Sequence, residues 1–281
     1  MTAGEAEIAE TVRRGDPDRY LAALYAPAPK REALLALYAF NVETAAVRDR
    51  ISEALPGEIR LQWWRDLLAE AADPASAAGH PIAAALLEVV RDYNLPVDAF
   101  QNMLEARIFD LYDDPMPSRT DLEGYCGETA SALIQLSSLI LDAEAAGRTA
   151  ALAGHAGCAQ AIAGLLRLLP IHRRRGQCYI PLDMLQAVGM TQDELVSGED
   201  TEGANRAVVA MIALGRDHLV EFRKGAGDIP PPLRPAFLPV SLAEAYFKRI
   251  EQSGLDPLDE IATLSPLRRH WLLLRHATKG W

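Results

Sequence analysis

ALLALYAFNVETAAVRDRISE, residues 33–53, is the stretch that organises the rest of the chain. Within it, steps of three or four residues separate Leu34, Tyr38, Asn41, Ala45 and Asp49. In a helix, this spacing places the five side chains on one face. A purely structural core stripe has no need of the amide and the carboxylate. We therefore predict one long helix over 33–53 that faces the centre of the molecule. Asp49 either lines a cavity or lies at the solvent border beside Arg48 and Arg50.

The composition around this stretch also favours helices. The chain has 281 residues, of which 49% are hydrophobic, and Ala and Leu dominate while β-branched runs are scarce. Neither an alternating strand nor a hairpin signal is present. Asp16 followed by Pro17 is typical of a capped helix start. We predict a single all-α domain over residues 1–281 with roughly ten to twelve helices, in which residues 1–15 are a peripheral N-terminal segment.

Three further helices are predicted from apolar periodicity and small residues. Ile59–Ala72 is amphipathic and is followed by a small-residue loop, Asp73–Gly79. Arg119–Ala146 and Gly154–Leu169 are rich in small residues, and Pro170 disturbs the end of the latter, because proline disfavours helical geometry in the residue before it. A basic turn follows.

Charge and cysteine usage exclude several classes of protein. The formal net charge of −11 makes general nucleic-acid binding a poor expectation. Cys126, Cys158 and Cys178 form no CxxC pair and no metal-ligand spacing, which is typical of a reduced compartment. The first twenty residues carry acidic side chains and no apolar core, so we expect neither a signal nor a transit peptide. No spanning helix is expected; we predict a cytoplasmic protein whose membrane contact, if any, is peripheral, at the inner membrane.

A series of landmarks resembles one known family. In chain order they are DRYLAALYAPAPKREALLALYAF (18–40), IRLQWWRD (59–66), GYCGETAS (124–131), RRGQCYIPLDML (174–185) and AEAYFKRIE (243–251). Over roughly residues 18–276 the chain resembles the squalene/phytoene synthase family. The resemblance implies the isoprenoid-synthase fold, with antiparallel helices around a central apolar cavity. Active members condense two prenyl diphosphates head to head, and two Asp-rich motifs hold the Mg²⁺ ions that bind the diphosphates.

The Asp-rich motifs are degenerate in this sequence. The family pattern, aligned on YAF at 38–40 and on the RRGxxYxP at 174–181, places its four carboxylates at Ala45, Asp49, Leu168 and His172. Asp49 alone is acidic, and Glu43 is a poor replacement because it lies about 160° around the helix from Ala45. We therefore predict no metal site, no catalytic residue and no cofactor. Mg²⁺ enters only under the alternative, an active prenyltransferase that condenses prenyl diphosphates head to head.

These departures resemble one branch of the family, which contains a mitochondrial complex I assembly factor and bacterial relatives. The resemblance implies a protein without synthase activity. It would bind an isoprenoid or lipid ligand or a protein partner, in the assembly of respiratory complex I. The residues that the family pattern places along the cavity are Tyr38, Asn41, Ala45, Asp49, Tyr125, Gln160, Arg167, Leu168 and His172.

Several of these residues have a structural interpretation as well. Arg167 either contacts a diphosphate or is a buried arginine paired with Asp49 or another acid. His172 is a base, a ligand or a turn histidine, and the last is favoured. The run Arg173–Arg175 is interpreted as a solvated turn rather than a phosphate site.

The C-terminal sequence LRRHWLLLRHATKGW (267–281) leaves a similar choice open. It carries Leu267, Trp271, Leu274 and Trp281 among basic residues. Such a helix lies either on an anionic membrane surface or, as we favour, on the domain itself.

Overall fold

The computed structural model describes residues 3–69, 77, 79–252 and 254–281. Regular secondary structure in these ranges is helical throughout, and no strand occurs within them, which confirms the predicted all-α class. The contacts divide the chain into two compact units. Unit 1 comprises Met1–Leu111, Ala132–Ala150 and Ile229–Pro239, and unit 2 comprises Tyr112–Ser131, Ala151–Asp228 and Val240–Trp281. Folding as a single domain remains a prediction.

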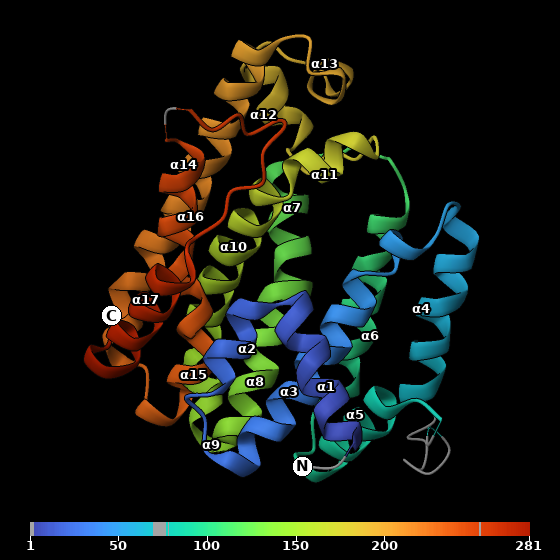
Figure 1. The fold of residues 1–281 in the computed structure, drawn as a ribbon, viewed down its shortest axis with the longest axis vertical. Helices are drawn as coiled ribbons and strands as arrows, with labels where there is room; N and C mark the ends of the chain where they lie inside the picture. The colour runs from blue at the N-terminus through green and yellow to red at the C-terminus, as the bar shows by residue number, and fades with distance from the viewer. Residues whose placement is uncertain (1–2, 70–76, 78, 253) are drawn as a thin grey trace. The chain divides into compact units, whose positions relative to one another are not determined.

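Unit 1 is built around one central helix (Figure 1). Its helices are α1 (Ala3–Gly15), α2 (Pro17–Ala23), α3 (Ala28–Ala45), α4 (Ala54–Ala69), α5 (Pro81–Asp92), α6 (Val97–Ile108), α8 (Ala132–Leu141), α9 (Ala143–Ala146) and α15 (Arg234–Phe237). Helix α3 packs against α1, α2, α5, α6 and α8. A helix that is apolar on nearly every side is stable only when neighbours surround it. Accordingly, residues 33–41 of α3 are all buried.

Aromatic side chains fill the core next to α3. The ring of Phe40 makes edge contacts with Trp64 of α4, at a centroid distance of 5.1 Å, and with Phe100 of α6, at 5.6 Å. All three side chains are fully buried. The predicted amphipathic helix over Ile59–Ala72 corresponds to α4, which begins at Ala54. Its predicted end at residues 70–72 lies outside the described residues, as does nearly all of the loop predicted over Asp73–Gly79.

The N-terminal residues take part in this core. Residues 1–15, predicted to be peripheral, form α1 from Ala3 onward. Ile8 and Val12 are buried, and α1 packs on α3 and α5. Helix α2 then begins as its sequence predicts: Asp16 accepts a hydrogen bond from the backbone N–H of Arg19 at 3.0 Å, and Pro17 occupies the first turn.

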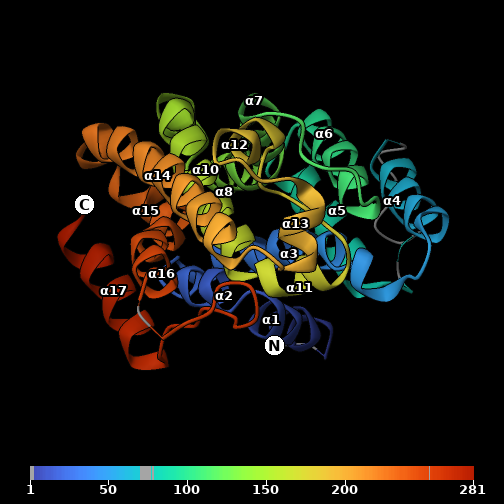
Figure 2. The ribbon, with the colours of Figure 1, turned by 90° about the horizontal axis from the view of Figure 1, so that it is seen from above.

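Unit 2 is built from α7 (Arg119–Cys126), a π-helical turn (Gly127–Ser131), α10 (Ala150–Arg167), α11 (Leu169–Arg174), α12 (Leu182–Ala187), α13 (Gln192–Ser197), α14 (Thr201–Gly225), α16 (Ala243–Ile250) and α17 (Pro266–Lys279). Helix α14 packs on α12, α13 and α16, and α11 packs on α13 (Figure 2). The uninterrupted α-helix predicted over Arg119–Ala146 is wrong in two ways. A π-helical turn lies between α7 and α8, and the helix ends at Leu141, because Asp142 takes an extended conformation and caps α9.

A close backbone approach in unit 2 joins α10 to the π-helical turn. A Cβ added at Gly157 would lie 2.4 Å from the Cα and the backbone N of Ser131. The hydroxyl of Ser131 donates to the carbonyl of Gly154 at 3.0 Å. Glycine at 157 therefore lets the two backbones touch.

In the part of the chain that the structure describes, one helical run satisfies the length and composition criteria for a membrane span. It covers Ala143–Arg167, and 50% of its most apolar window is buried inside the protein. Core helices of soluble proteins satisfy the same criteria, so this run is weak evidence for a span. The absence of a spanning helix remains a prediction.

Candidate ligand-binding site

The predicted site residues of α3 are used largely for packing. Tyr38 is buried, and its hydroxyl accepts a hydrogen bond from Ser137 at 3.2 Å. Burial raises the pKa of Tyr38 above its usual value of 10.0. The amide oxygen of Asn41 accepts a hydrogen bond from the guanidinium of Arg107 at 3.3 Å, and Arg107 also pairs with Asp110 at 3.0 Å. Tyr38 and Asn41 thus tie α3 to α8 and α6.

Ala45 and Asp49 do not share a helix face. The α-helix predicted to reach residue 53 ends at Ala45, and Asp49 lies in the 3₁₀ turn Arg48–Arg50. The N–H of Val47 bonds to the carbonyl of Thr44 at 3.3 Å, and the N–H of Asp49 bonds to that of Ala46 at 3.1 Å. These i to i−3 bonds wind the chain more tightly than an α-helix and redirect the side chain of Asp49. Ala45 and Asp49 are both exposed.

In unit 2, Arg167 contacts the segment that precedes α17. Its Nε donates to the carbonyl of Ala262 at 3.2 Å, and its guanidinium lies over the ring of Tyr246, 4.2 Å from the centroid. A carbonyl and an aromatic face are both favourable partners for a partly buried cation. Seven residues earlier on α10, Gln160 is half-buried, and its Oε1 has no hydrogen-bond partner within the described residues.

Leu168 lies at the junction of α10 and α11, and His172 lies one turn further along, on α11, where its N–H bonds to the carbonyl of Leu168 at 3.0 Å. Helix α10 ends at Arg167, Leu168 is exposed, and α11 begins at Leu169 with Pro170 in its first turn. A disturbance is present near Pro170, but it lies at Leu168, one residue before the predicted position, since Leu169 is already helical. The basic segment predicted to be a turn is a turn only at Arg175 and Gly176. Proline is favourable at a helix start and opens α11, which includes Arg173 and Arg174.

An aromatic cluster brings two of the predicted residues together. The ring of His172 lies 4.6 Å from that of Tyr179, which lies 5.9 Å from that of Tyr125. Next to His172, Arg173 pairs with Asp259 at 3.3 Å. His172 and Tyr125 therefore both contact Tyr179, and Arg173 is not simply solvated.

Glu43, the carboxylate judged a poor replacement for the missing motif residue, is buried and lies near three basic side chains of unit 1. Glu43 lies 3.4 Å from Arg50, 3.7 Å from Arg60 and 3.1 Å from Nε2 of His80. The Nδ1 of His80 accepts from the backbone N–H of Ala83, so a neutral His80 carries its proton on Nε2, the nitrogen that lies near Oε2 of Glu43. The network joins α3, the 3₁₀ turn, α4 and α5, and no sequence spacing predicts it.

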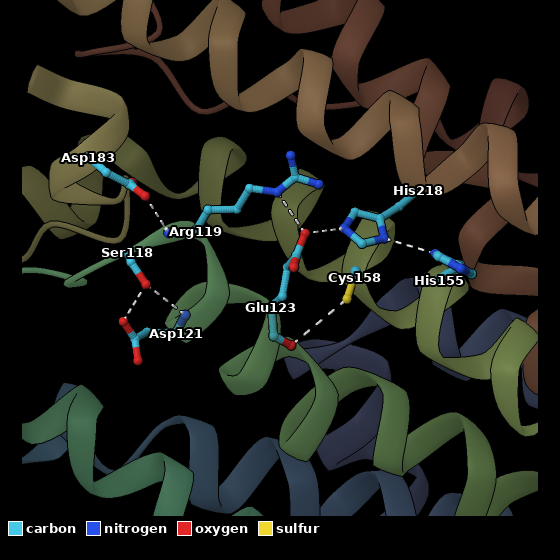
Figure 3. A network of polar contacts seen from close by, with 8 residues as sticks. All are labelled: Ser118, Arg119, Asp121, Glu123, His155, Cys158, Asp183 and His218. Carbon is cyan, nitrogen blue, oxygen red and sulfur yellow. Dashed lines mark hydrogen bonds and ion pairs between the residues drawn. The ribbon is translucent and has the colours of Figure 1, made fainter. Parts of the chain in front are cut away.

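A second polar network lies on α7, α10 and α14 in unit 2 (Figure 3). The carboxylate of Glu123 lies 2.9 Å from Nε of Arg119 and 3.2 Å from Nε2 of His218. The Nδ1 of His218 lies 3.1 Å from Nδ1 of His155. At the start of α7, Asp183 accepts from the backbone N–H of Arg119 at 3.1 Å and so holds the helix that carries Glu123.

Two of the three cysteines also meet at this network. All three are buried thiols that form no disulfide. The thiol of Cys126 lowers the pKa of Cys158 by hydrogen bonding, against the opposing effect of burial. Burial raises the pKa of Cys178 to about 11. The sulfur of Cys158 lies 4.0 Å from the carbonyl of Glu123. The contact between Cys126 and Cys158 could not be predicted, because the two residues are far apart in the sequence.

The proton arrangement of the histidine pair follows from its contacts. An ionised Glu123 accepts from Nε2–H of His218, which leaves Nδ1 of a neutral His218 as an acceptor for Nδ1–H of His155. The chain of groups can hold or move a proton. Within the described residues, no group of three or more His, Cys, Asp or Glu side chains is placed to hold a metal ion.

Acidification should weaken the fold through His218. Burial lowers the pKa of His218 below its usual value of 6.5; Glu123 opposes this effect and His155 adds to it. A histidine whose pKa is lower in the folded than in the unfolded state makes its full contribution to the free energy of unfolding above its unfolded pKa of 6.5. This contribution is lost as the pH falls toward the folded pKa. Urea unfolding at a series of pH values should therefore show a steeper loss of stability below that point for the wild type than for His218→Gln. Parallel curves for the two proteins would contradict this assignment.

Comparison with known proteins defines first the class and then the family. The fold is the isoprenoid-synthase fold: the chain matches the crystal structure of a dehydrosqualene synthase in complex with ligand with a TM-score of 0.82, at 19% identity, covering 99% of this chain and 97% of that one. A family model described as squalene/phytoene synthase matches residues 12–275. The chain belongs to the squalene/phytoene synthase family, as the sequence predicts.

Its relatives include proteins of two kinds. The NADH dehydrogenase (ubiquinone) complex I, assembly factor 6 of Bos taurus is 30% identical over 262 residues, which cover 92% of this chain and 78% of the relative. The 15-cis-phytoene synthase of Synechococcus elongatus is 24% identical over 254 residues, which cover 84% of this chain and 80% of the synthase. The predicted similarity of this chain to the branch that contains the assembly factor is thus confirmed.

Proposed function

We propose that this family member is a pseudoenzyme, without synthase activity, that acts by binding in the assembly of respiratory complex I. One observation carries the proposal. Of the four positions at which the family pattern places carboxylates, only Asp49 is acidic, and it lies on a 3₁₀ turn beyond the end of α3. Mg²⁺ requires near-octahedral oxygen coordination and binds poorly to one isolated carboxylate.

The second Asp-rich motif supports the same conclusion. Its two positions hold Leu168 and His172, which lie at the junction of α10 and α11 and on α11. The side chain of Leu168 has no oxygen, and the ring of His172 packs on Tyr179. In this proposal the protein needs no cofactor. The 30% identity to the assembly factor over most of the chain supports the cellular role.

The chain retains features suited to ligand binding. Gly164 lies on the same side of α10 as Gln160, and among the described residues no atom beyond the adjoining backbone of α10 lies within 4 Å of a Cβ added there. The unpartnered Oε1 of Gln160 could accept a hydrogen bond from a bound molecule. We propose an isoprenoid or lipid as the small ligand, with a protein partner in complex I assembly, in the cytoplasm or at the inner membrane.

The alternative is an active prenyltransferase with a reduced metal site. The similarity to the phytoene synthase of Synechococcus elongatus is the observation in its favour. It requires Mg²⁺ and therefore predicts that Asp49 is indispensable. The two proposals thus differ in what they expect of a single, exposed carboxylate.

Deletion of the gene in a host that has complex I tests the proposed role. We expect a several-fold loss of assembled complex I on native gels, with a matching loss of NADH:quinone activity. Plasmid-borne wild type and Asp49→Asn should restore both equally, because Asp49 is exposed and the proposed role needs no metal. Normal complex I in the deletion strain would overturn the assembly role. Rescue by the wild type but not by Asp49→Asn would support the prenyltransferase.

A further inference from the structure

The outer face of α17 is apolar and exposed. Leu267, Trp271 and Leu274 are 82%, 56% and 52% exposed. Because each helical residue turns by about 100°, these three side chains lie within about 60° of arc. Three large apolar side chains exposed together on one helix stripe differ from the singly scattered ones of an ordinary surface. The stripe therefore calls for a partner that covers it.

The opposite face fixes α17 to unit 2. Leu273 is fully buried, and Arg269 donates to the hydroxyl of Tyr246 on α16 at 3.5 Å. Figures 1 and 2 show α17 beside α16. The ring of Trp281 lies 4.8 Å from Phe222 and 4.8 Å from His276. Trp281, grouped by the sequence pattern with the exposed residues, thus packs within unit 2, and the outer face is presented on a fixed helix.

A basic flank runs along one side of the apolar stripe. Arg268, Arg275 and Lys279 fall within about 40° of one another on the helix. Helix α17 contains no Asp or Glu, although the chain as a whole has a net charge of −11. Within the described residues these three cations form no ion pair; the guanidinium of Arg275 lies 5.5 Å from the ring centroid of Trp271. Among the described residues, no carboxylate therefore lies within ion-pair distance of the positive charge beside the stripe.

We propose that the outer face of α17 binds the surface of a bilayer that contains anionic phospholipid. Apolar side chains that include a tryptophan would enter the boundary between headgroups and acyl chains, and the basic flank would face the lipid phosphates. With 14 residues, α17 is shorter than the ~20 that a span requires, so it would lie along the surface. This inference does not depend on the proposed function.

Charge complementarity favours a membrane over a second copy of the chain. A two-fold dimer through this face would place the same patch against itself. Two basic flanks would then meet with no acidic residue on either α17 to compensate them. An anionic bilayer offers opposite charge and an apolar layer together. A dimer remains one of the outcomes that the test distinguishes.

Vesicle flotation with the full-length protein tests the proposal. We expect binding to phosphatidylcholine vesicles that contain phosphatidylglycerol, little binding to phosphatidylcholine alone, and weaker binding as salt is raised. Leu267→Ser with Trp271→Ser should lower the partition coefficient at least about tenfold. Arg268→Gln, Arg275→Gln and Lys279→Gln together should lower it by about a hundredfold, since each basic side chain near an anionic surface contributes about a factor of five to ten.

Two matched controls distinguish the α17 face from general stickiness and from net charge. Leu55→Ser with Ile59→Ser removes two equally exposed apolar side chains from α4. Arg14→Gln, Arg91→Gln and Lys224→Gln together remove three exposed cations elsewhere. Both controls should bind as the wild type does, and circular dichroism should show all variants folded.

Three outcomes would overturn the proposal. One is wild-type protein that fails to float with anionic vesicles at low salt. Another is a control set that loses as much binding as its α17 counterpart. The third is a wild-type dimer in light scattering that becomes a monomer on Leu267→Ser with Trp271→Ser while vesicle binding is unchanged, since the stripe would then be a protein interface.

Discussion

Incubation of the unmodified protein with farnesyl or geranylgeranyl diphosphate and Mg²⁺ should release no pyrophosphate above the enzyme-free rate. An active synthase would exceed that rate by at least about a million-fold. The reaction needs cations to neutralise the charge that develops on the departing diphosphate. Ala45 and Leu168 supply no oxygen ligand, and the ring of His172 packs on Tyr179. Asp49 is left alone, and it lies off α3.

The effect of EDTA on pyrophosphate release distinguishes the two proposals. A dehydrosqualene synthase run in parallel should release pyrophosphate and should lose that activity when EDTA is added. Robust turnover by this protein that EDTA abolishes would show that it has a functional metal site, and the prenyltransferase alternative would replace the pseudoenzyme. Turnover that EDTA leaves unchanged would contradict both proposals.

Restoring the missing carboxylates is not expected to restore turnover. Ala45→Asp, Leu168→Asp and His172→Asp would recreate the motif letters. However, Asp49 lies on a 3₁₀ turn, and residue 168 lies between α10 and α11. The first pair would not present two carboxylates on one continuous α-helical face, which is what the i, i+4 spacing normally provides, and the second pair would begin at the residue where α10 and α11 are discontinuous. Metal binding by the triple variant, measured by calorimetry, should remain weak.

Gly157→Ala should be the most damaging single methyl group that can be added to α10. The new Cβ would lie 2.4 Å from backbone atoms of Ser131. Backbone cannot rotate away as a flexible side chain can, so α10 and the π-helical turn must separate. We expect a loss of about 3 kcal/mol in the free energy of unfolding, at the upper end for overpacking. Urea denaturation followed by far-UV circular dichroism measures it.

Gly164→Ala is the matched control for this substitution. It makes the same chemical change on the same helix, seven residues away, where among the described residues an added Cβ meets no atom beyond the adjoining backbone of α10 within 4 Å. Alanine is the better helix former, so this variant should gain up to about 1 kcal/mol. Equal stability changes in the two variants would mean that the backbones at Gly157 are farther apart than described.

Sequence reasoning succeeded where periodicity and local chemistry act alone. The burial of α3 followed from its apolar pattern, and the start of α2 followed from Asp16 and Pro17. It failed at residue 46, because the periodic pattern continues to Asp49 while the backbone tightens into a 3₁₀ turn that buries Val47. Periodicity cannot distinguish a continuous helix from one that ends in a 3₁₀ turn and so buries an apolar side chain.

The candidate site was predictable only in part for a different reason. Motif alignment identified the positions of the lost carboxylates, and it placed Tyr125 and His172, which both contact Tyr179. It could not find Glu43 with His80, or Glu123 with His218, because these partners are separated by 37 and 95 residues. Contacts of that kind arise when helices pack, and they leave no spacing to recognise.

The discontinuity of unit 1 has a consequence for synthesis. Helix α3 needs α8 as a neighbour, and α8 in turn packs on α15, which is translated about two hundred residues after α3. Helix α3 therefore leaves the ribosome long before all the helices of unit 1 have been synthesised. At that stage Ser137, which donates a hydrogen bond to the hydroxyl of Tyr38, has not been translated. Native contacts so distant in sequence slow folding and prolong the exposure of apolar surface. Early α3 should accordingly be a substrate for chaperones that act at the ribosome exit.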